Sequence, residues 1–184
     1  IEDGWFNTGD IGYMDAEGFL YLSGRAKDLI IRSGHNIDPE LIEEPLNAHA
    51  DVVTSIAIGL PDPYAGELPM AYVVKVADSD VTEQELIDHC ASAMSERAAI
   101  PKRIAFIDAM PLTAVGKIFR PTLRQKVSEQ VIGELLAKES IDVAITSEIE
   151  KKRGLVLSID VADKTKIDEV KKLVEGYIFT SEVN

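Results

Sequence analysis

Three short segments of the sequence place charged side chains beside glycine, a combination suited to holding a polar ligand on a turn. In the first, Asn7-Thr8-Gly9-Asp10, we expect the aspartate to lie on a tight turn. Its two carboxylate oxygens could accept hydrogen bonds from both hydroxyls of a ribose, as an acidic residue does in dinucleotide sites. Because Asn, Gly and Asp are ordinary turn residues, a turn without a ligand is the alternative interpretation.

The second segment runs from Ser23 to Gly34 and alternates basic and acidic side chains. The planar guanidinium of Arg25 could hold a phosphate or ribose oxygen. Gly34 has no side chain, so a slender ligand could pass close to its backbone. The alternative is a solvated strand edge, on which exposed charges are common.

The third segment runs from Pro111 to Ile118 and contains Gly116 and Lys117. It lacks the first glycine that a phosphate-cradling P-loop requires. It could still bring one positive charge to a site when the loop closes. That charge would offset the repulsion between a carboxylate and the phosphate that it attacks. A solvated loop lysine is the alternative.

The elements that must position these segments form a small α+β unit, a mixed sheet with flanking helices. Alternating apolar residues predict two short strands before residue 25, and Asp38-Pro39 predicts a helix start. Pro45 should kink or shorten that helix. Thr82 and Glu85 fit a capping box. The expected strands are 11–14, 19–23, 29–32, 52–58, 68–76 and 104–107, with a turn at 59–63, helices at 82–97 and 122–139, and a loop at 111–120.

The last part of the chain differs in character and is expected to form a strand–strand–helix–strand unit. The strands are predicted at 141–146, 155–161 and 177–180, and the helix at 164–174.

The bulk properties exclude several classes of protein. A formal net charge of −13 argues against nucleic-acid binding, which needs a clustered basic face. No apolar run approaches the length of a transmembrane segment. The single cysteine, Cys90, fits a reducing compartment, so we expect a cytoplasmic protein. The three histidines, His35, His49 and His89, are not spaced as a metal site, and no metal is predicted. Because the chain starts without Met inside an expected turn, we expect a fragment.

Taken together, the order and spacing of these segments resemble the adenylate-forming (AMP-binding) superfamily of acyl- and aryl-CoA synthetases, luciferases and peptide-synthetase adenylation domains. The resemblance covers residues 1 to about 126. It rests on a Trp-x-x-Thr-Gly-Asp segment, a hinge motif, the stretch after the hinge, a mid-domain turn and the terminal lysine motif, which lie at Gly4–Asp10, Gly24–Asp28, Ser33–Glu40, Gly59–Glu67 and Pro111–Arg120.

The resemblance implies a domain organisation and a set of site residues. Residues 1–26 would be the last strands of a large N-terminal domain that this chain lacks. Residues 27–126 would be the mobile C-terminal domain, here called the lid. Residues 127–184 would be a helix and a small α/β extension of unknown role, whose part from residue 141 onward is here called the tail. By position, Lys117 would be catalytic, Asp10 and Arg25 would bind the nucleotide, Lys27 would be the hinge, and Ser33 and Gly34 would line the CoA tunnel.

The activity implied is that of an AMP-forming acid–CoA ligase. The full-length enzyme would use ATP, Mg²⁺ and CoA as substrates, with Mg²⁺ bound mainly by the missing domain, and this fragment would hold no cofactor and be inactive alone. Its partners would be its own N-terminal domain, CoA and a carboxylic acid, for which a fatty acid is favoured. A luciferase tunnel lysine is absent, because Ile31 stands in its place. Two alternatives stay open, a non-catalytic interaction module and an adenylation domain that loads a carrier protein.

Overall fold

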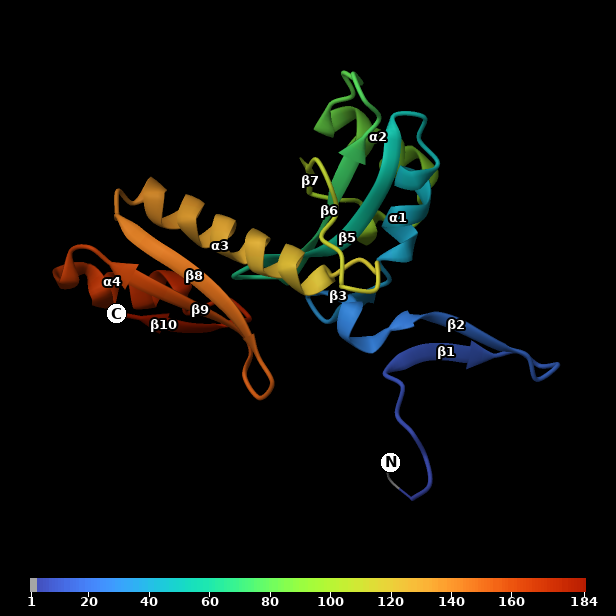
Figure 1. Ribbon diagram of the computed structural model, residues 1–184, viewed down its shortest axis with the longest axis horizontal. Helices are drawn as coiled ribbons and strands as arrows, with labels where there is room; N and C mark the ends of the chain where they lie inside the picture. Colours follow the sequence, from blue (N-terminus) through green and yellow to red (C-terminus); the bar gives the residue numbers. More distant parts are fainter. Residues whose placement is uncertain (1–2) are drawn as a thin grey trace.

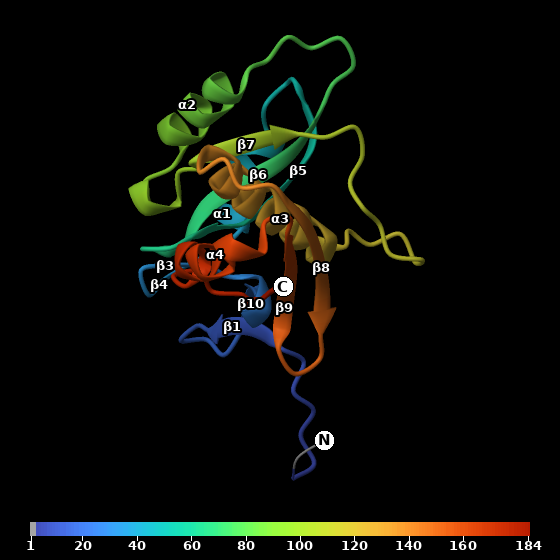
Figure 2. The same cartoon turned by 90° about the vertical axis from the view of Figure 1, so that its left-hand side faces the viewer.

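The computed structural model describes residues 3–184, which form a hairpin, a central sheet with three helices, and a second small sheet (Figures 1 and 2). The strands are β1 Asp10–Met14, β2 Leu20–Arg25, β3 Ile30–Arg32, β4 His35–Ile37, β5 Val52–Asp62, β6 Gly66–Lys75, β7 Arg103–Phe106, β8 Val143–Glu150, β9 Gly154–Val161 and β10 Thr180–Val183. The α-helices are α1 Glu40–Asn47, α2 Glu83–Ala93, α3 Arg120–Lys138 and α4 Ile167–Val174, and short 3-10 helices lie at Ala26–Asp28, Arg97–Ala99 and Lys164–Lys166. The predicted α+β class, with a small mixed sheet and flanking helices, is confirmed.

The lid sheet has the strand order β4-β3-β6-β5, and β7 pairs in parallel with β6. The apolar side chains of β5 and β6 alternate between its two faces, as the pleat of a strand requires. Ala57, Ala71 and Val73 pack in a cluster with α1 and α2, whereas Ile58 and Met70 pack in a cluster with α3. Helices therefore cover both faces, which explains why these strands are apolar almost throughout.

The turn between β5 and β6 lies further along the chain than the sequence predicts. Pairing with β6 continues through the expected turn at 59–63 and ends where Asp62 lies opposite Gly66. The Asp62 carboxylate then accepts hydrogen bonds from the amides of Tyr64 and Ala65, at 2.9 and 2.7 Å. The long β6 strand supplies cross-strand partners that outweigh the local turn signal.

The helix ends follow local hydrogen bonding. Thr82 and Glu85 form the predicted capping box, in which the Glu85 amide donates to Thr82 Oγ1 and the Thr82 amide donates to Glu85 Oε2. Helix α2 ends at Ala93, before the predicted residue 97. Helix α1 is only eight residues long and contains Pro45, in agreement with a shortened helix.

The tail forms a separate three-stranded sheet of order β10-β9-β8, with β8–β9 antiparallel and β9–β10 parallel. Its last strand begins at Thr180, three residues after the predicted start at 177. Before this strand, the chain lies against the lid. A side chain at Gly176 would come within 3.0 Å of Pro63, so the chain passes over the β5–β6 turn before it joins the tail sheet.

Helix α3 joins the lid and the tail. Its ribbon runs from the lid sheet to the tail sheet (Figure 1). Leu123 and Val127 pack in the lid core, and Ile132 and Leu136 pack in the tail core. The predicted boundary between residues 126 and 127 thus falls within one continuous helix. The same helix covers the edge of β8, because Gln125 Nε2 donates to the carbonyl of Ser147 at 2.9 Å. Within residues 3–184, no helix is long and apolar enough to cross a membrane.

Candidate functional site

Asp10 and Arg25 face each other at the open end of the β1–β2 hairpin, where the strand register makes them partners. Arg25 Nε donates to Asp10 Oδ1 at 3.1 Å, and Arg25 Nη2 donates to the carbonyl of Thr8 at 3.1 Å. The Asp10 turn is also tied to the start of the lid, because the Ala26 amide donates to the carbonyl of Gly9 at 2.9 Å. A carboxylate and a guanidinium are thus presented together beside the predicted hinge.

Ser33 and Gly34 form the two-residue turn between β3 and β4. Their φ angles are +50° and +81°, and two positive values are typical of the hairpin turn that matches the twist of paired strands. Glycine is favoured at the second position because it adopts this conformation without strain. The Ser33 amide donates to the carbonyl of Ala65 at 2.7 Å, which fixes the turn against the β5–β6 turn. Both residues of this turn are exposed.

Lys117 lies on residues 111–119, here called the lysine loop, between β7 and α3. The loop is closed by hydrogen bonds across its base, from the Thr113 amide to the Lys117 carbonyl at 2.7 Å and from the Lys117 amide to Thr113 Oγ1 at 3.1 Å. Gly116 has a φ of +78°, which any other residue would adopt only with strain. The loop therefore has a defined shape while the Lys117 side chain is exposed.

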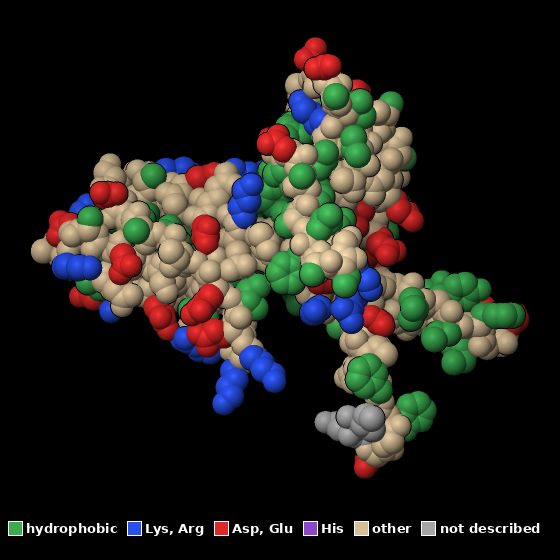
Figure 3. Space-filling view, viewed as in Figure 1, with side chains coloured by type: hydrophobic (Ala, Val, Ile, Leu, Met, Phe, Trp, Pro, Cys, Tyr) green, Lys and Arg blue, Asp and Glu red, His purple; other side chains and the backbone are tan. Residues whose placement is uncertain are grey.

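The predicted site residues are brought together only in part. Asp10 and Arg25 are in contact, and Lys27 follows them in the exposed 3-10 helix Ala26–Asp28. Between residues 3 and 184, no hydrogen bond or ion pair joins Lys117 to Asp10 or Arg25. Basic side chains do gather where the hairpin meets the lid (Figure 3).

An ionic cluster beside the hinge was missed by the sequence analysis. Arg120 Nη1 donates to Glu43 Oε1 at 2.8 Å, and Arg120 Nε lies 3.7 Å from Asp28 Oδ2. Arg124 Nη1 lies 3.7 Å from Oε1 of Glu67, a buried residue. Asp28 belongs to the hinge motif, but Glu43 and Arg120 are separated by 77 positions, and no local pattern indicates that they pair.

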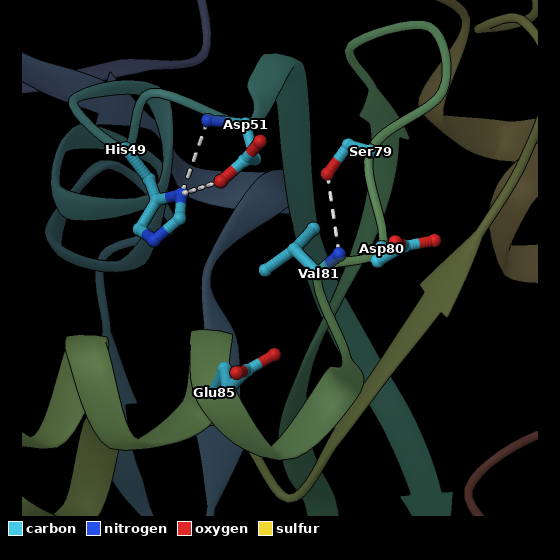
Figure 4. A pocket seen from close by; sticks show the side chains of 6 residues that line it. All are labelled: His49, Asp51, Ser79, Asp80, Val81 and Glu85. Atoms are coloured by element: carbon cyan, nitrogen blue, oxygen red, sulfur yellow. Dashed lines mark hydrogen bonds and ion pairs between the residues drawn. The ribbon is translucent and has the colours of Figure 1, made fainter.

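A shallow hollow of about 450 Å³ lies on the lid, lined by His49, Asp51, Ser79, Asp80, Val81 and Glu85 (Figure 4). Its polar groups serve local structure, since the Asp51 amide donates to His49 Nδ1 and the Val81 amide donates to Ser79 Oγ. Glu85 accepts hydrogen bonds from the Thr82 amide and hydroxyl, and these hold the pKa of its carboxyl below the usual value. None of the predicted site residues lines this hollow.

Metal-ligating side chains do not gather in groups of three or more anywhere in the described chain, residues 3–184. The fold does bring His49 and His89 together, with ring centroids 4.9 Å apart and the rings edge to face. His89 Nε2 is engaged with the carbonyl of Pro45 at 3.0 Å. The pair belongs to the packing between α1 and α2.

Residues 41–117 match the family model described as the AMP-binding enzyme C-terminal domain. The chain therefore carries the C-terminal domain of the AMP-binding enzymes, and the resemblance drawn from the sequence is confirmed.

Three proteins similar to this chain are CoA ligases or CoA synthetases. Marinolic acid–CoA ligase from Pseudoalteromonas sp. (strain SANK 73390) is 44% identical over 163 residues, 88% of this chain and 25% of the relative. Two solved structures match with TM-scores of 0.58 and 0.62 at 38% and 37% identity: a fatty acyl CoA synthetase from Mycobacterium tuberculosis and an o-succinylbenzoate CoA synthetase from Bacillus subtilis in complex with its acyl-adenylate intermediate. They cover 71% and 67% of this chain, and the chain covers 26% and 25% of them.

The chain thus spans about a quarter of the length of the relatives that it matches. The match to the marinolic acid ligase covers so much of this chain that it must include β8 and β9. These two proteins therefore share part of the tail as well as the lid.

Proposed function

We propose that this chain is the C-terminal lid of an AMP-forming acid–CoA ligase. In the first half-reaction, a carboxylic acid attacks the α-phosphate of ATP, giving an acyl-adenylate and pyrophosphate. In the second, the thiol of CoA attacks the acyl carbon and AMP leaves. The observation that carries the proposal is the exposed Lys117 on a hydrogen-bonded loop, in a chain whose residues 41–117 match the C-terminal domain of this family.

The two anionic partners in adenylation repel each other, and Lys117 would supply the compensating positive charge. Hydrogen bonds between Thr113 and the Lys117 backbone hold the loop in shape. The Lys117 side chain is exposed and is thus available to a ligand. Positioned charge of this kind lowers the barrier because it needs no reorganisation during the reaction.

Asp10 and Arg25 would bind the nucleotide. Their contact at 3.1 Å holds the carboxylate in a defined place, from which it could accept hydrogen bonds from ribose hydroxyls, while the guanidinium faces a phosphate or ribose oxygen. Lys27 follows directly, where a few backbone torsions would turn the lid between its two poses. Ser33 and Gly34 would line the path of CoA, since their turn exposes backbone without a bulky side chain.

The hairpin supports the proposal that residues 1–26 belong to the large domain, although residues 1 and 2 lie outside the described part of the chain. Apolar side chains cover the hairpin (Figure 3), and Trp5, Phe19 and Leu22 are 81%, 66% and 69% exposed. An apolar surface of this kind is typical of a site that another protein surface covers. We infer that the N-terminal domain buries it.

The acid itself is proposed to be a fatty acid, and the protein is proposed to act in the cytoplasm. The mycobacterial relative is a fatty acyl CoA synthetase, but the other two relatives are named for different acids. The acid pocket and the main Mg²⁺ ligands would lie in the N-terminal domain, so the isolated chain is expected to be inactive.

ATP–pyrophosphate exchange by the full-length protein, across a panel of acids, tests the proposal. Lys117→Ala is expected to lower exchange on the order of 10²- to 10³-fold, the scale of losing one positioned electrostatic group. Lys138→Ala is the matched control, because Lys138 is also exposed but lies at the far end of α3. Exchange by Lys117→Ala at the wild-type rate would contradict the proposal. If Lys117→Ala loses exchange, the acid of the panel that supports the fastest exchange by the wild-type protein identifies the substrate.

Two alternative functions predict different experimental results. Transfer to a phosphopantetheinyl carrier protein but not to free CoA would identify a carrier-loading adenylation domain. If deletion of residues 141–184 abolishes a partner interaction while adenylation is spared, the tail is the part that binds the partner, and a deletion that changes only solubility would discard the interaction module. The shared β8 and β9 favour a ligase that includes the tail.

A further inference from the structure

We infer that Arg120 is a positioning residue that clamps the base of the lysine loop to the hinge, through Glu43 and Asp28. The inference rests on the proposed role of Lys117 and adds to it a residue that does not itself touch the reacting groups.

Arg120 contacts three different residues of the chain at once, two through side chains and one through the backbone. Its Nη1 donates to Glu43 Oε1 at 2.8 Å and to the carbonyl of Ala57 at 2.9 Å, and its Nη2 donates to Glu43 Oε2 at 3.3 Å. Its Nε lies 3.7 Å from Asp28 Oδ2. The three side chains are only 13–22% exposed. A planar guanidinium can satisfy these partners at once, and a lysine cannot.

The carboxylate of Glu43, which accepts the hydrogen bonds of Arg120, is also held by a second partner. Glu43 Oε1 also accepts a hydrogen bond from the Ala57 amide at 2.8 Å, so α1 and β5 together fix the carboxylate. Removing the guanidinium would leave a mostly buried carboxylate without its cation, which is strongly unfavourable. Both oxygens of the Glu43 carboxylate thus accept hydrogen bonds, from the Ala57 amide and from Arg120.

The clamp joins the two predicted moving parts of the lid. Asp28 follows the hinge residue Lys27, and Arg120 begins α3 three positions after Lys117. Between Lys117 and Arg120 the chain is also pinned, because the Phe119 amide donates to the carbonyl of Pro111 at 2.8 Å. Arg124 adds a second link, with Nη2 at 3.4 Å from the carbonyl of Asp28. The position of the lysine loop is thus set relative to the hinge.

A matched control is an ion pair between strand β7 and the same helix. Arg103 forms a two-pronged pair with Glu134, at 2.9 and 3.3 Å, which links β7 to α3. That pair has the same chemistry but contacts neither the hinge nor the lysine loop. Its Arg103 side chain is 28% exposed against 21% for Arg120.

The first experiment measures ATP–pyrophosphate exchange by the full-length protein over a range of ATP concentrations, with the acid saturating and well below each variant's melting temperature. Arg120→Gln is expected to lower kcat roughly tenfold or more with little change in the KM for ATP, because small displacements of a catalytic group slow chemistry steeply. Arg103→Gln is expected to leave kcat within about twofold of wild type. Equal losses in the two variants, or an unchanged kcat in Arg120→Gln, would overturn the inference. Arg120→Lys and Glu43→Gln serve if Arg120→Gln does not fold.

The second experiment needs no ligase activity. Trypsin cleavage of the Lys117–Ile118 bond, followed by mass spectrometry on the chain, reports how freely the lysine loop opens. Arg120→Gln is expected to be cleaved about tenfold faster than Arg103→Gln. Equal cleavage rates contradict the clamp. If Lys117→Ala keeps full exchange, the proposed function fails whatever trypsin reports. If Lys117→Ala is inactive and Arg120→Gln behaves as Arg103→Gln, the clamp alone fails.

Discussion

The lid and the tail are both small sheets built against α3, and they differ in how their faces are covered. In the lid, α1 and α2 cover one face and α3 covers the other. In the tail, Ile145, Leu157 and Ile159 pack with α3 and α4. The opposite face is exposed at Ala144, Glu148 and Asp160, although it also holds the buried Val156. The two regions also differ in chemistry, since every predicted site residue of the lid lies on a turn, a loop or a short 3-10 helix and the tail carries none.

This difference indicates a division of labour. The doubly covered lid sheet is a rigid frame from which exposed turns can present charge, and rigid elements hold such groups more accurately than loops alone. The tail covers the C-terminal half of α3, whose Ile132 and Leu136 would otherwise be exposed. Substitutions in each region can show whether the lid and the tail unfold as one cooperative unit.

The largest expected effect is on the reactivity of Cys90. This thiol is fully buried in the lid core, and burial raises its pKa to about 11. Alkylation by iodoacetamide at pH 8 is expected to be on the order of 10³-fold slower in the folded chain than in urea, because the thiol reacts only after the lid core opens. Mass spectrometry over time measures both rates.

A reporter in the tail sharpens this comparison. Ile159→Cys, in a Cys90→Ala background, places a thiol at a fully buried position of β9 in the tail core. Similar protection at both sites indicates one cooperative unit. A tail thiol that reacts much faster than Cys90 would show that the tail opens by itself.

The next effect is on the shared helix. Leu136→Ala is expected to lower the free energy of unfolding by about 2–5 kcal/mol, because it leaves a cavity at a fully buried position of the tail core. Leu123→Ala does the same in the lid core. Urea denaturation followed by circular dichroism should give one transition in each case. Leu41→Ala, at a position 42% exposed, is the control and should change stability by less than about 1 kcal/mol. Two separate unfolding transitions in Leu136→Ala would show that the lid and the tail unfold independently.

The capping box of α2 gives a smaller effect confined to the lid. Thr82→Ala is expected to destabilise the chain by about 1 kcal/mol, through loss of the side-chain acceptor for the Glu85 amide. A change in the unfolding midpoint of the same size as that of Leu136→Ala would contradict this ordering.

The pH dependence of the same box has a defined sign. Hydrogen bonds from Thr82, the backbone amide first, hold the pKa of Glu85 below its ordinary 4.5. A lowered pKa means that the ionised carboxylate stabilises the fold above that pH, and that this contribution is lost as the pH falls through the folded-state pKa. The destabilisation caused by Glu85→Gln should thus be present at pH 7 and shrink below about pH 4.5. A penalty that grows on acidification would contradict the assignment.

The smallest effect is expected in the tail. Arg153 pairs with Glu150 and Glu182, which ties the β8–β9 turn to β10, but its side chain is 44% exposed. Exposed ion pairs add little to stability because water and salt screen them. Arg153→Ala is expected to leave the urea midpoint almost unchanged, and a large shift would show that the tail depends on this cluster.

The sequence by itself determined the features that depend on neighbouring residues. The Thr82–Glu85 box, the shortened helix at Pro45 and strand β7 depend on hydrogen bonds and packing patterns a few positions apart, and they lie where they were predicted or close to it. The turns that carry Gly34 and Lys117 could be placed on the same grounds, and so could the turn before Asp10, although Asp10 itself is the first residue of β1 rather than a turn residue. In the turns before Asp10 and at Lys117 a nearby threonine hydroxyl accepts the backbone amide, so local geometry suffices there.

Only the tertiary structure decided the features that depend on distant partners. The β5–β6 turn moved to Asp62 because β6 supplied more cross-strand pairing, and the three-residue strand β4 exists only because β3 lies beside it. The pairing of Glu43 with Arg120 joins α1 to α3 across 77 positions, and the sharing of α3 by two cores needs both sheets to be formed. Such contacts leave no periodic trace in the chain, because the residues that satisfy them become neighbours only when the whole core is assembled.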